Sequence, residues 1–210
     1  MPLANIRRKN RALVYFLAAQ PRSITREQLL VFFWPDRERT AAQRILRTMI
    51  HDLRKTLGPS FLADDQSLWL APESTIDLQL FLKALQAAQS DSSFLAGALD
   101  CYQGDFLEGF SLPDSPQFED WILAEREHYR LMAMRALADL AHYHESLGDF
   151  AGALEAIRRA LKFDPLQEDL HRDALRLYYL NGDRAGVVRQ YESLRNLLDE
   201  RDGHSPSDLC

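Results

Sequence analysis

The clearest pattern in the chain is an amphipathic stretch between Arg37 and Gly58. Its hydrophobic residues recur at steps of three and four, which form one apolar stripe on a helix. They are Ala42, Ile45, Leu46, Met49, Ile50, Leu53 and Leu57. The opposite face carries cations and hydrogen-bonding side chains, namely Thr40, Gln43, Arg44, Arg47, Thr48, His51, Arg54 and Lys55. The pattern predicts a helix over 37–57 with one face on a core and the other open to water or nucleic acid.

Two shorter helices are predicted before this stretch. Residues 7–20 place their apolar positions mostly on one face and stop before Pro21, which a preceding helix cannot easily pass. Thr25 and Gln28 have the spacing of a capping box, so a second helix begins there and runs to about Trp34. The amino-terminal part is therefore a compact set of three helices.

A β-hairpin is predicted after the third helix. Gly58 and Pro59 end that helix in the usual order of glycine cap and proline, and the apolar runs 61–63 and 68–71 flank a polar loop. Three helices and a hairpin form a winged helix, in which the third helix enters the major groove and the hairpin, or wing, lies along the DNA backbone.

A further helix is predicted over 76–88, and residues 89–93 have the composition of a linker. We place the domain boundary at this linker. The first domain is then a winged-helix DNA-binding domain over 1–88.

The second half is helical and repetitive. Its two glycine–aspartate turns, at Gly148 and Gly182, are 34 residues apart, which is the period of tetratricopeptide (TPR) repeats. The predicted fold class is therefore mainly α: a winged helix-turn-helix with a short β-hairpin wing, followed by a TPR-like α-helical repeat domain over 94–203 and a tail over 204–210. Such stacks usually bind peptides or other domains.

Charge is distributed unevenly along the chain. Residues 1–60 contain 12 Lys and Arg against 4 Asp and Glu, a net charge of +8, whereas the rest contains 13 against 27, a net charge of −14. A basic module gains from counterion release when it neutralises phosphates, and an acidic one is repelled by them. If nucleic acid is bound, the amino-terminal part is therefore expected to bind it. With the winged-helix plan, the predicted partner is double-stranded DNA.

Other kinds of chemistry lack their signatures. The sequence has no GxxxxGK[ST], GxGxxG or GxSxG motif, and phosphate-binding loops and nucleophile elbows need those glycines. His142 and His144 are two residues apart on a predicted helix and point in different directions, which disfavours a shared metal. We expect no enzyme, no metal and no cofactor.

The chain has the features of a cytoplasmic protein. Cys101 and Cys210 lie far apart without zinc-site spacing, which fits a reducing compartment. No apolar run approaches the roughly 20 residues that span a bilayer, and no export leader opens the sequence. We expect no membrane contact.

Four motifs lie in order along the first half: Arg8-Lys9-x-Arg11-Ala12-Leu13, Trp34-Pro35-Asp36, Leu53-Arg54-Lys55-x-Leu57 and Ile76-Asp77-x-x-x-Phe81. Together they resemble the DNA-binding domain of bacterial antibiotic-regulatory (SARP-type) activators, which is related to response-regulator winged helices. In that family a small antiparallel sheet precedes the first helix. Residues 1–6 alone precede it here, so this sheet is expected to be truncated.

The second half carries Tyr102-x-Gly104-Asp105-Phe106-Leu107-x-Gly109-Phe110, Asp164-Pro165-Leu166-x-Glu168, His171-Arg172-x-Ala174-Leu175 and Arg189-Gln190-Tyr191. These motifs are similar to the bacterial transcriptional activator domain that follows the winged helix in those regulators. The resemblance implies a transcriptional activator. It also implies that the helical-repeat half mediates formation of a homodimer, or contacts RNA polymerase or additional regulatory domains.

The predicted DNA contacts divide by position. Side chains central on the exposed face of the third helix are expected to reach base edges, and those at its ends, on the first helix and on the wing to meet phosphates. The first set is Gln43, Arg44, Arg47, Thr48 and His51; the second is Arg8, Lys9, Arg39, Arg54, Gln66 and Ser67. The alternative is a helical-repeat interaction scaffold whose winged helix contacts protein instead of DNA.

Overall fold

The computed structural model describes residues 6–201, with side chains through Asp199. The chain packs into two compact units. The first unit comprises the residues up to Leu82 together with Gly104–His128, and the second comprises Lys83–Gln103 and the residues from Tyr129 onward. The expected truncated sheet at the amino terminus and the tail over 204–210 lie outside the described residues.

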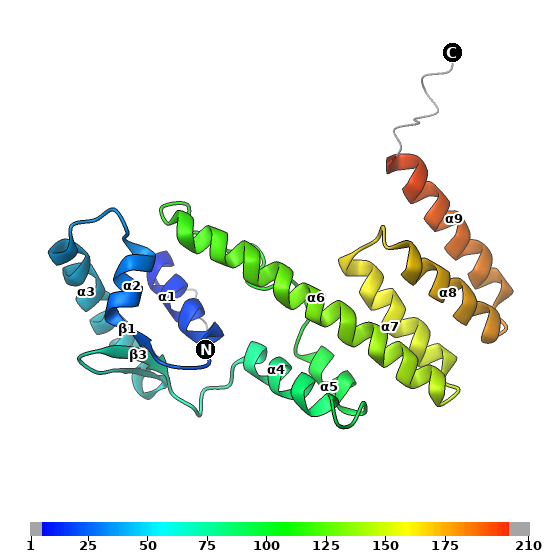
Figure 1. Ribbon diagram of the computed structural model, residues 1–210, viewed down its shortest axis with the longest axis horizontal. Coiled ribbons are helices and arrows are strands. Elements are labelled where there is room, and N and C mark those ends of the chain that lie inside the picture. Colours follow the sequence, from blue (N-terminus) through cyan, green and yellow to red (C-terminus); the bar gives the residue numbers. More distant parts are fainter. Residues whose placement is uncertain (1–5, 202–210) are drawn as a thin grey trace, which may run out of the picture. The chain divides into compact units, whose positions relative to one another are not determined.

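The first unit contains the predicted winged helix (Figure 1). Its helices are α1 (Arg8–Ala19), α2 (Arg26–Phe33) and α3 (Arg39–Leu57). A 3₁₀ turn, Gly58–Ser60, leads into β2 (Phe61–Ala63) and β3 (Ser67–Leu70), which pair antiparallel. A third strand, β1 (Ile24–Thr25), adds to β3 and gives the sheet order β1-β3-β2. The sequence pattern missed β1 because it has two residues.

Local capping fixes the helix boundaries. The capping box of Thr25 and Gln28 is present at the start of α2, and Gly58 ends α3 at φ 55°, a conformation that favours glycine. The third helix begins at Arg39 and not at Arg37 as predicted. The reason is the Glu38 side chain, whose carboxylate accepts hydrogen bonds from the backbone N–H groups of Thr40 and Ala41, both at 2.9 Å.

An aromatic core joins α1 and α2 to residues far along the sequence. Phe16 stacks on Phe32 with ring centroids 4.4 Å apart, and the Trp121 ring lies 5.0 Å from that of Phe16. The rings of Phe33 and Phe118 are 5.6 Å apart, and Phe118 is fully buried. The start of α6 (Pro116–Ser146) therefore packs within the core of the winged helix. The domain division at residues 89–93 stays a prediction, because packing does not report independent folding.

The second unit is helical (Figure 1). Its elements are the end of α4 (Asp77–Ala88), α5 (Phe94–Asp100), the later part of α6, α7 (Phe150–Phe163), α8 (Glu168–Leu180) and α9 (Arg184–Arg201). Helix α8 packs against both α7 and α9. The fold class predicted from the sequence, a winged helix with a helical-repeat region, is confirmed.

The 34-residue repeat is visible in two matching turns. Gly148 and Gly182 adopt φ angles of 73° and 74°. After each glycine an aspartate accepts a hydrogen bond from the backbone N–H three residues later, Asp149 from Gly152 at 2.9 Å and Asp183 from Gly186 at 2.8 Å. The repeated motif is thus a glycine turn with an aspartate cap, and both halves of it favour a helical hairpin.

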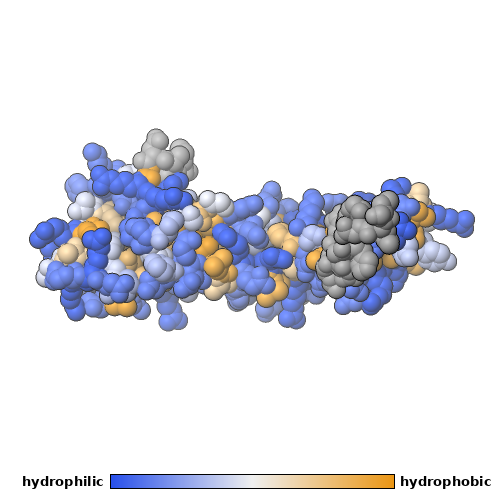
Figure 2. All heavy atoms as spheres, turned by 90° about the horizontal axis from the view of Figure 1, so that it is seen from above, coloured by the Kyte–Doolittle hydropathy of each residue, from blue (hydrophilic) through white to orange (hydrophobic). Residues whose placement is uncertain are grey.

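The face of the molecule shown in Figure 2 is largely hydrophilic, with hydrophobic residues in small separate patches. Among the described residues, none of the helices has the length and apolar character needed to cross a membrane.

Candidate nucleic-acid interface

Burial of one side of α3 sets the orientation of the other. The residues of the predicted apolar stripe are buried at Ala42, Leu46, Met49, Ile50, Leu53 and Leu57, and Ile45 is half-buried. Because these residues follow the helical period, the side chains between them face outward. The predicted division of α3 into a core face and an open face is confirmed.

The open face presents cations that are exposed to solvent. Arg44, Arg47 and His51 are exposed, and among the described residues none of them forms a hydrogen bond through its side chain or a salt bridge. Thr48 is also exposed, and its hydroxyl donates to the Arg44 carbonyl at 3.2 Å. The side chains of Arg44, Arg47 and His51 therefore need not break a hydrogen bond or salt bridge with another described residue before they contact a ligand.

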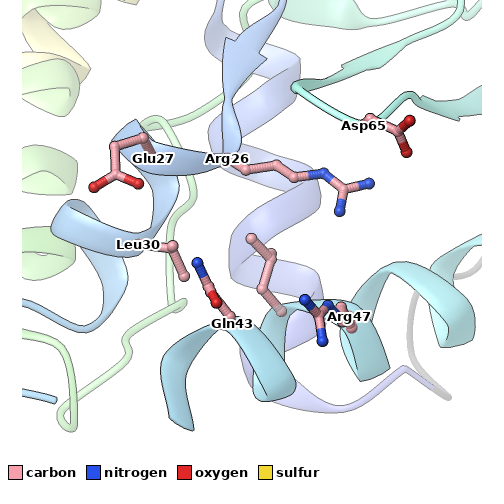
Figure 3. Close-up of a pocket in the computed structure, with 7 residues that line it drawn as sticks. Arg26, Glu27, Leu30, Gln43, Arg47 and Asp65 are labelled. Carbon is pink, nitrogen blue, oxygen red and sulfur yellow. The ribbon is translucent and has the colours of Figure 1, made fainter. Parts of the chain in front are cut away.

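A hollow beside this face brings α2, α3 and the wing together (Figure 3). Its volume is about 210 Å³, and it is lined by Arg26, Glu27, Leu30, Gln43, Leu46, Arg47 and Asp65. Small-molecule sites usually occupy roughly 300–1,000 Å³, so the hollow is small for a metabolite. The half-buried Gln43 and the exposed Arg47 stand on its α3 side, where both can face a ligand lying across the open face.

The cations predicted to meet phosphates each have an internal partner. Arg8 donates to the Ser111 hydroxyl at 3.0 Å, and Lys9 forms a 3.0 Å salt bridge with Asp114. The partners lie 103 and 105 residues away in sequence, so the sequence could not reveal them.

The cations at the two ends of α3 are also engaged. Arg39 forms a 2.8 Å salt bridge with Glu27, and both side chains are exposed. Arg54 donates to the carbonyl of Ala63 and thereby ties the end of α3 to strand β2. Exposed ion pairs contribute little, about 0–1 kcal/mol, so Arg39 can exchange Glu27 for another anion at small cost.

The loop of the wing is held by Asp64. Its carboxylate accepts from the backbone N–H groups of Ser67 at 2.6 Å and Gln66 at 2.7 Å, and these bonds lower the pKa of Asp64 because they favour the charged form. The side chain of Gln66 is exposed, whereas Ser67 is half-buried in β3. Of the two predicted wing contacts, Gln66 is the more open.

Arg26 was missed by the sequence interpretation. Its backbone N–H donates to the Gln66 carbonyl at 2.7 Å, and its guanidinium donates to the Asp64 carbonyl. Figure 3 shows its side chain extending from the start of α2 toward the loop that carries Asp65. In the sequence, the position of Arg26 directly after the Thr25 cap places it in the first turn of α2. Its contact with the wing becomes visible only when the positions of the hairpin residues are known.

Known proteins share this architecture. The family described as "Bacterial transcriptional activator domain" matches residues 76–209, more than half of the chain. A solved structure of Mycobacterium tuberculosis EmbR in complex with a low affinity phosphopeptide is similar with a TM-score of 0.62 and 20% sequence identity, over 95% of this chain and 56% of that chain. At this identity the likeness shows the fold alone. No curated protein matches the sequence.

The fold, a winged helix joined to a helical-repeat region, and the family match over residues 76–209 together define the class of this chain. The chain belongs to the bacterial transcriptional activator domain family, as its motifs implied. The family is one of transcriptional regulators and not a class of enzymes. The chain spans a little over half the length of the EmbR chain that it matches.

Proposed function

We propose that the protein binds duplex DNA sequence-specifically and regulates transcription, with α3 in the major groove. The observation that carries this proposal is the open face of α3, where the side chains of Arg44, Arg47 and His51 form no hydrogen bond or salt bridge with another described residue while the opposite face is buried. An exposed helix face of unpaired donors matches the hydrogen-bond acceptors that guanine presents in the major groove.

Base reading is assigned to the centre of α3. Gln43, Arg44, Arg47, Thr48 and His51 span about two turns of one helix face. A recognition helix typically directs three or four side chains at base edges. Arg47 is assigned a bidentate contact, because it borders the hollow and is itself exposed.

Phosphate contacts are assigned to the residues around that centre, which are Arg8, Lys9, Arg39, Arg54, Gln66 and Ser67. The paired cations among them exchange an internal acceptor for a phosphate oxygen. This exchange is favourable when the free energy gained from counterion release exceeds the free energy of the internal bonds lost.

The remaining assignments rest on the family. We propose that the protein activates transcription instead of repressing it and that it forms a homodimer. We also propose that it contacts RNA polymerase or additional regulatory domains and that it is located in the cytoplasm. The reason in each case is that regulators of this type are its relatives.

The test begins with selection of bound duplexes from a random pool. The selected duplex is then titrated with protein over a salt series. About five neutralised phosphates predict a slope of log K against log[salt] near about −4 to −5. No binding to any duplex at low salt would favour the scaffold alternative, in which the winged helix contacts protein.

A further inference from the structure

The outward face of α9 carries a self-complementary row of side chains. Its inward face is fixed by contacts with α8. Gly186 lies against the Tyr178 ring, where an added Cβ would come within 2.2 Å, and the Gln190 side-chain nitrogen lies 2.7 Å from Nδ1 of the buried His171. The helical period then places the opposite row outward, and it consists of Arg184, Val188, Tyr191, Arg195 and Asp199.

This row, with Glu192 beside it, combines exposed apolar residues with charged side chains that pair with no other described residue. Val188 is 56% exposed and Tyr191 is 58% exposed. Arg184, Glu192, Arg195 and Asp199 are exposed, and none forms a side-chain hydrogen bond or a salt bridge with another described residue. By contrast, Arg189 lies off the row and pairs with Asp183 at 3.4 Å. The row therefore has both a hydrophobic centre and free charges of opposite sign at its two ends.

We propose that this face binds the same face of a second copy of the chain, with the two α9 helices antiparallel. A twofold axis between Tyr191 and Glu192 places Arg184 opposite Asp199 of the second copy, and the same axis places Val188 opposite Arg195. A twofold interface must be self-complementary in this way, because each contact occurs twice.

The register satisfies the charges as well as the apolar residues. Each Arg184 meets an Asp199 at the rim, and each Arg195 lies one turn from a Glu192 across the axis while its aliphatic stem covers Val188. The two Tyr191 rings flank the axis at the centre. A parallel arrangement would instead place Arg184 beside Arg184 and Asp199 beside Asp199, and like charges so placed repel.

The contact extends over about 22 Å of one helix from each copy. A stable interface needs about 1,200 Å² or more of total buried surface, and a single pair of helices of this length is small for that. The free protein is therefore a weak dimer. Two copies on neighbouring DNA half-sites would gain from their raised effective concentration. The interface deepens the homodimer proposed above and rests on that part of the proposed function. The pairing itself does not depend on DNA, so its test is done without DNA and its failure would leave DNA binding untouched.

The test is sedimentation equilibrium of the full chain at low salt, over about 10–300 μM, where a contact of this size dissociates. Arg184→Glu and Asp199→Arg each replace two attractive contacts by two repulsive ones, and each lowers the association constant by about tenfold. An equimolar mixture of the two variants restores association. In the mixed pair the two introduced side chains, which have opposite charges, meet at one end, and the native Arg184 and Asp199 meet at the other. The double variant Arg184→Glu/Asp199→Arg also associates.

Lys162→Glu is the matched control. It makes the same charge change as Arg184→Glu at an exposed position of α7 and should leave association unchanged. Circular dichroism checks that each variant is folded. The proposal is overturned if the wild type stays monomeric at the highest concentration, if the single variants associate like the wild type, or if the mixture stays monomeric.

Discussion

The centre of α3 and the cations around it differ in one respect, which is whether the side chain already has a partner. The side chains of Arg44, Arg47 and His51 on the open face form no hydrogen bond or salt bridge with another described residue, whereas Arg39 and Arg54 at the two ends of the same helix are held by Glu27 and by the Ala63 carbonyl. All five are polar positions of one amphipathic helix. Polarity alone therefore does not separate groups free to bind from groups that position the fold.

This difference assigns two roles within one basic surface. Unpaired donors can be aimed at base edges at no internal cost. Paired cations hold the wing and α2 in place. The weaker the internal bond of such a cation, the more the cation can contribute to DNA binding.

Removing an unpaired cation should have the largest effect on DNA binding. Arg47→Ala is expected to lower affinity for the selected site by roughly 1–3 kcal/mol, with a smaller loss on random duplex, if it makes a bidentate contact. Fluorescence anisotropy titrations on both duplexes at one salt concentration measure the ratio. Lys83→Ala, an exposed cation of α4, is the control. An unchanged ratio for Arg47→Ala would remove Arg47 from the base-reading set.

Removing a cation that positions the fold should act on stability. Arg54→Ala loses the bond to the Ala63 carbonyl and is expected to reduce the free energy of unfolding by about 0.5–1.5 kcal/mol. For a chain of this size each kcal/mol lowers Tm by about 2–4 °C. The neighbouring Lys55→Ala removes an exposed cation that has no partner among the described residues, and Tm should stay the same. Equal melting of the two variants would contradict the anchoring role of Arg54.

Releasing a paired cation should strengthen DNA binding modestly. Glu27→Gln removes the partner of Arg39 and a negative charge from the hollow. We expect affinity for specific and random duplexes to rise equally, by less than about 1 kcal/mol, because Arg39 no longer gives up Glu27 when it meets a phosphate. Glu73→Gln, an exposed acid in the turn before α4, controls for the change in net charge. Weaker DNA binding by Glu27→Gln would contradict this prediction and show that DNA binding needs the intact Arg39–Glu27 salt bridge.

The smallest effect concerns acid stability of the wing. The pKa of Asp64 is lowered by the N–H groups of Ser67 and Gln66. The stabilisation from its ionised form is therefore present above the ordinary aspartate pKa and is lost as pH falls through the lowered one. The difference in Tm between wild type and Asp64→Asn should be constant above about pH 5 and shrink in acid. Asp65→Asn is the neighbouring control. A difference that grew as pH fell would contradict this assignment.

Much of the architecture could be predicted because it depends on short sequence signals. The period of the α3 stripe, the Thr25 capping box and the glycine turns at Gly148 and Gly182 all correspond to observed features. Each signal acts within a few residues along the chain. Interactions between neighbouring residues therefore determine these features, which is why a single sequence is enough to predict them.

The missing features depend on contacts between distant residues. Lys9 and Asp114 are separated by 105 residues, and the packing of Trp121 against Phe16 joins two regions that the sequence assigned to different domains. Arg26 meets the wing through a hairpin whose path the sequence does not give. The candidate residues were predicted correctly as polar and mostly exposed, but the sequence could not show which of them are already paired.

The most direct test of base reading by α3 combines a protein change with a change in the DNA. Each guanine of the selected site is replaced in turn by 7-deazaguanine, which removes the N7 acceptor that an arginine contacts. Wild type, Arg44→Ala and Arg47→Ala are then titrated on every duplex. The account predicts at least one guanine at which the replacement weakens wild-type binding but not binding by one of the variants. Equal losses for all three proteins at every guanine would contradict it.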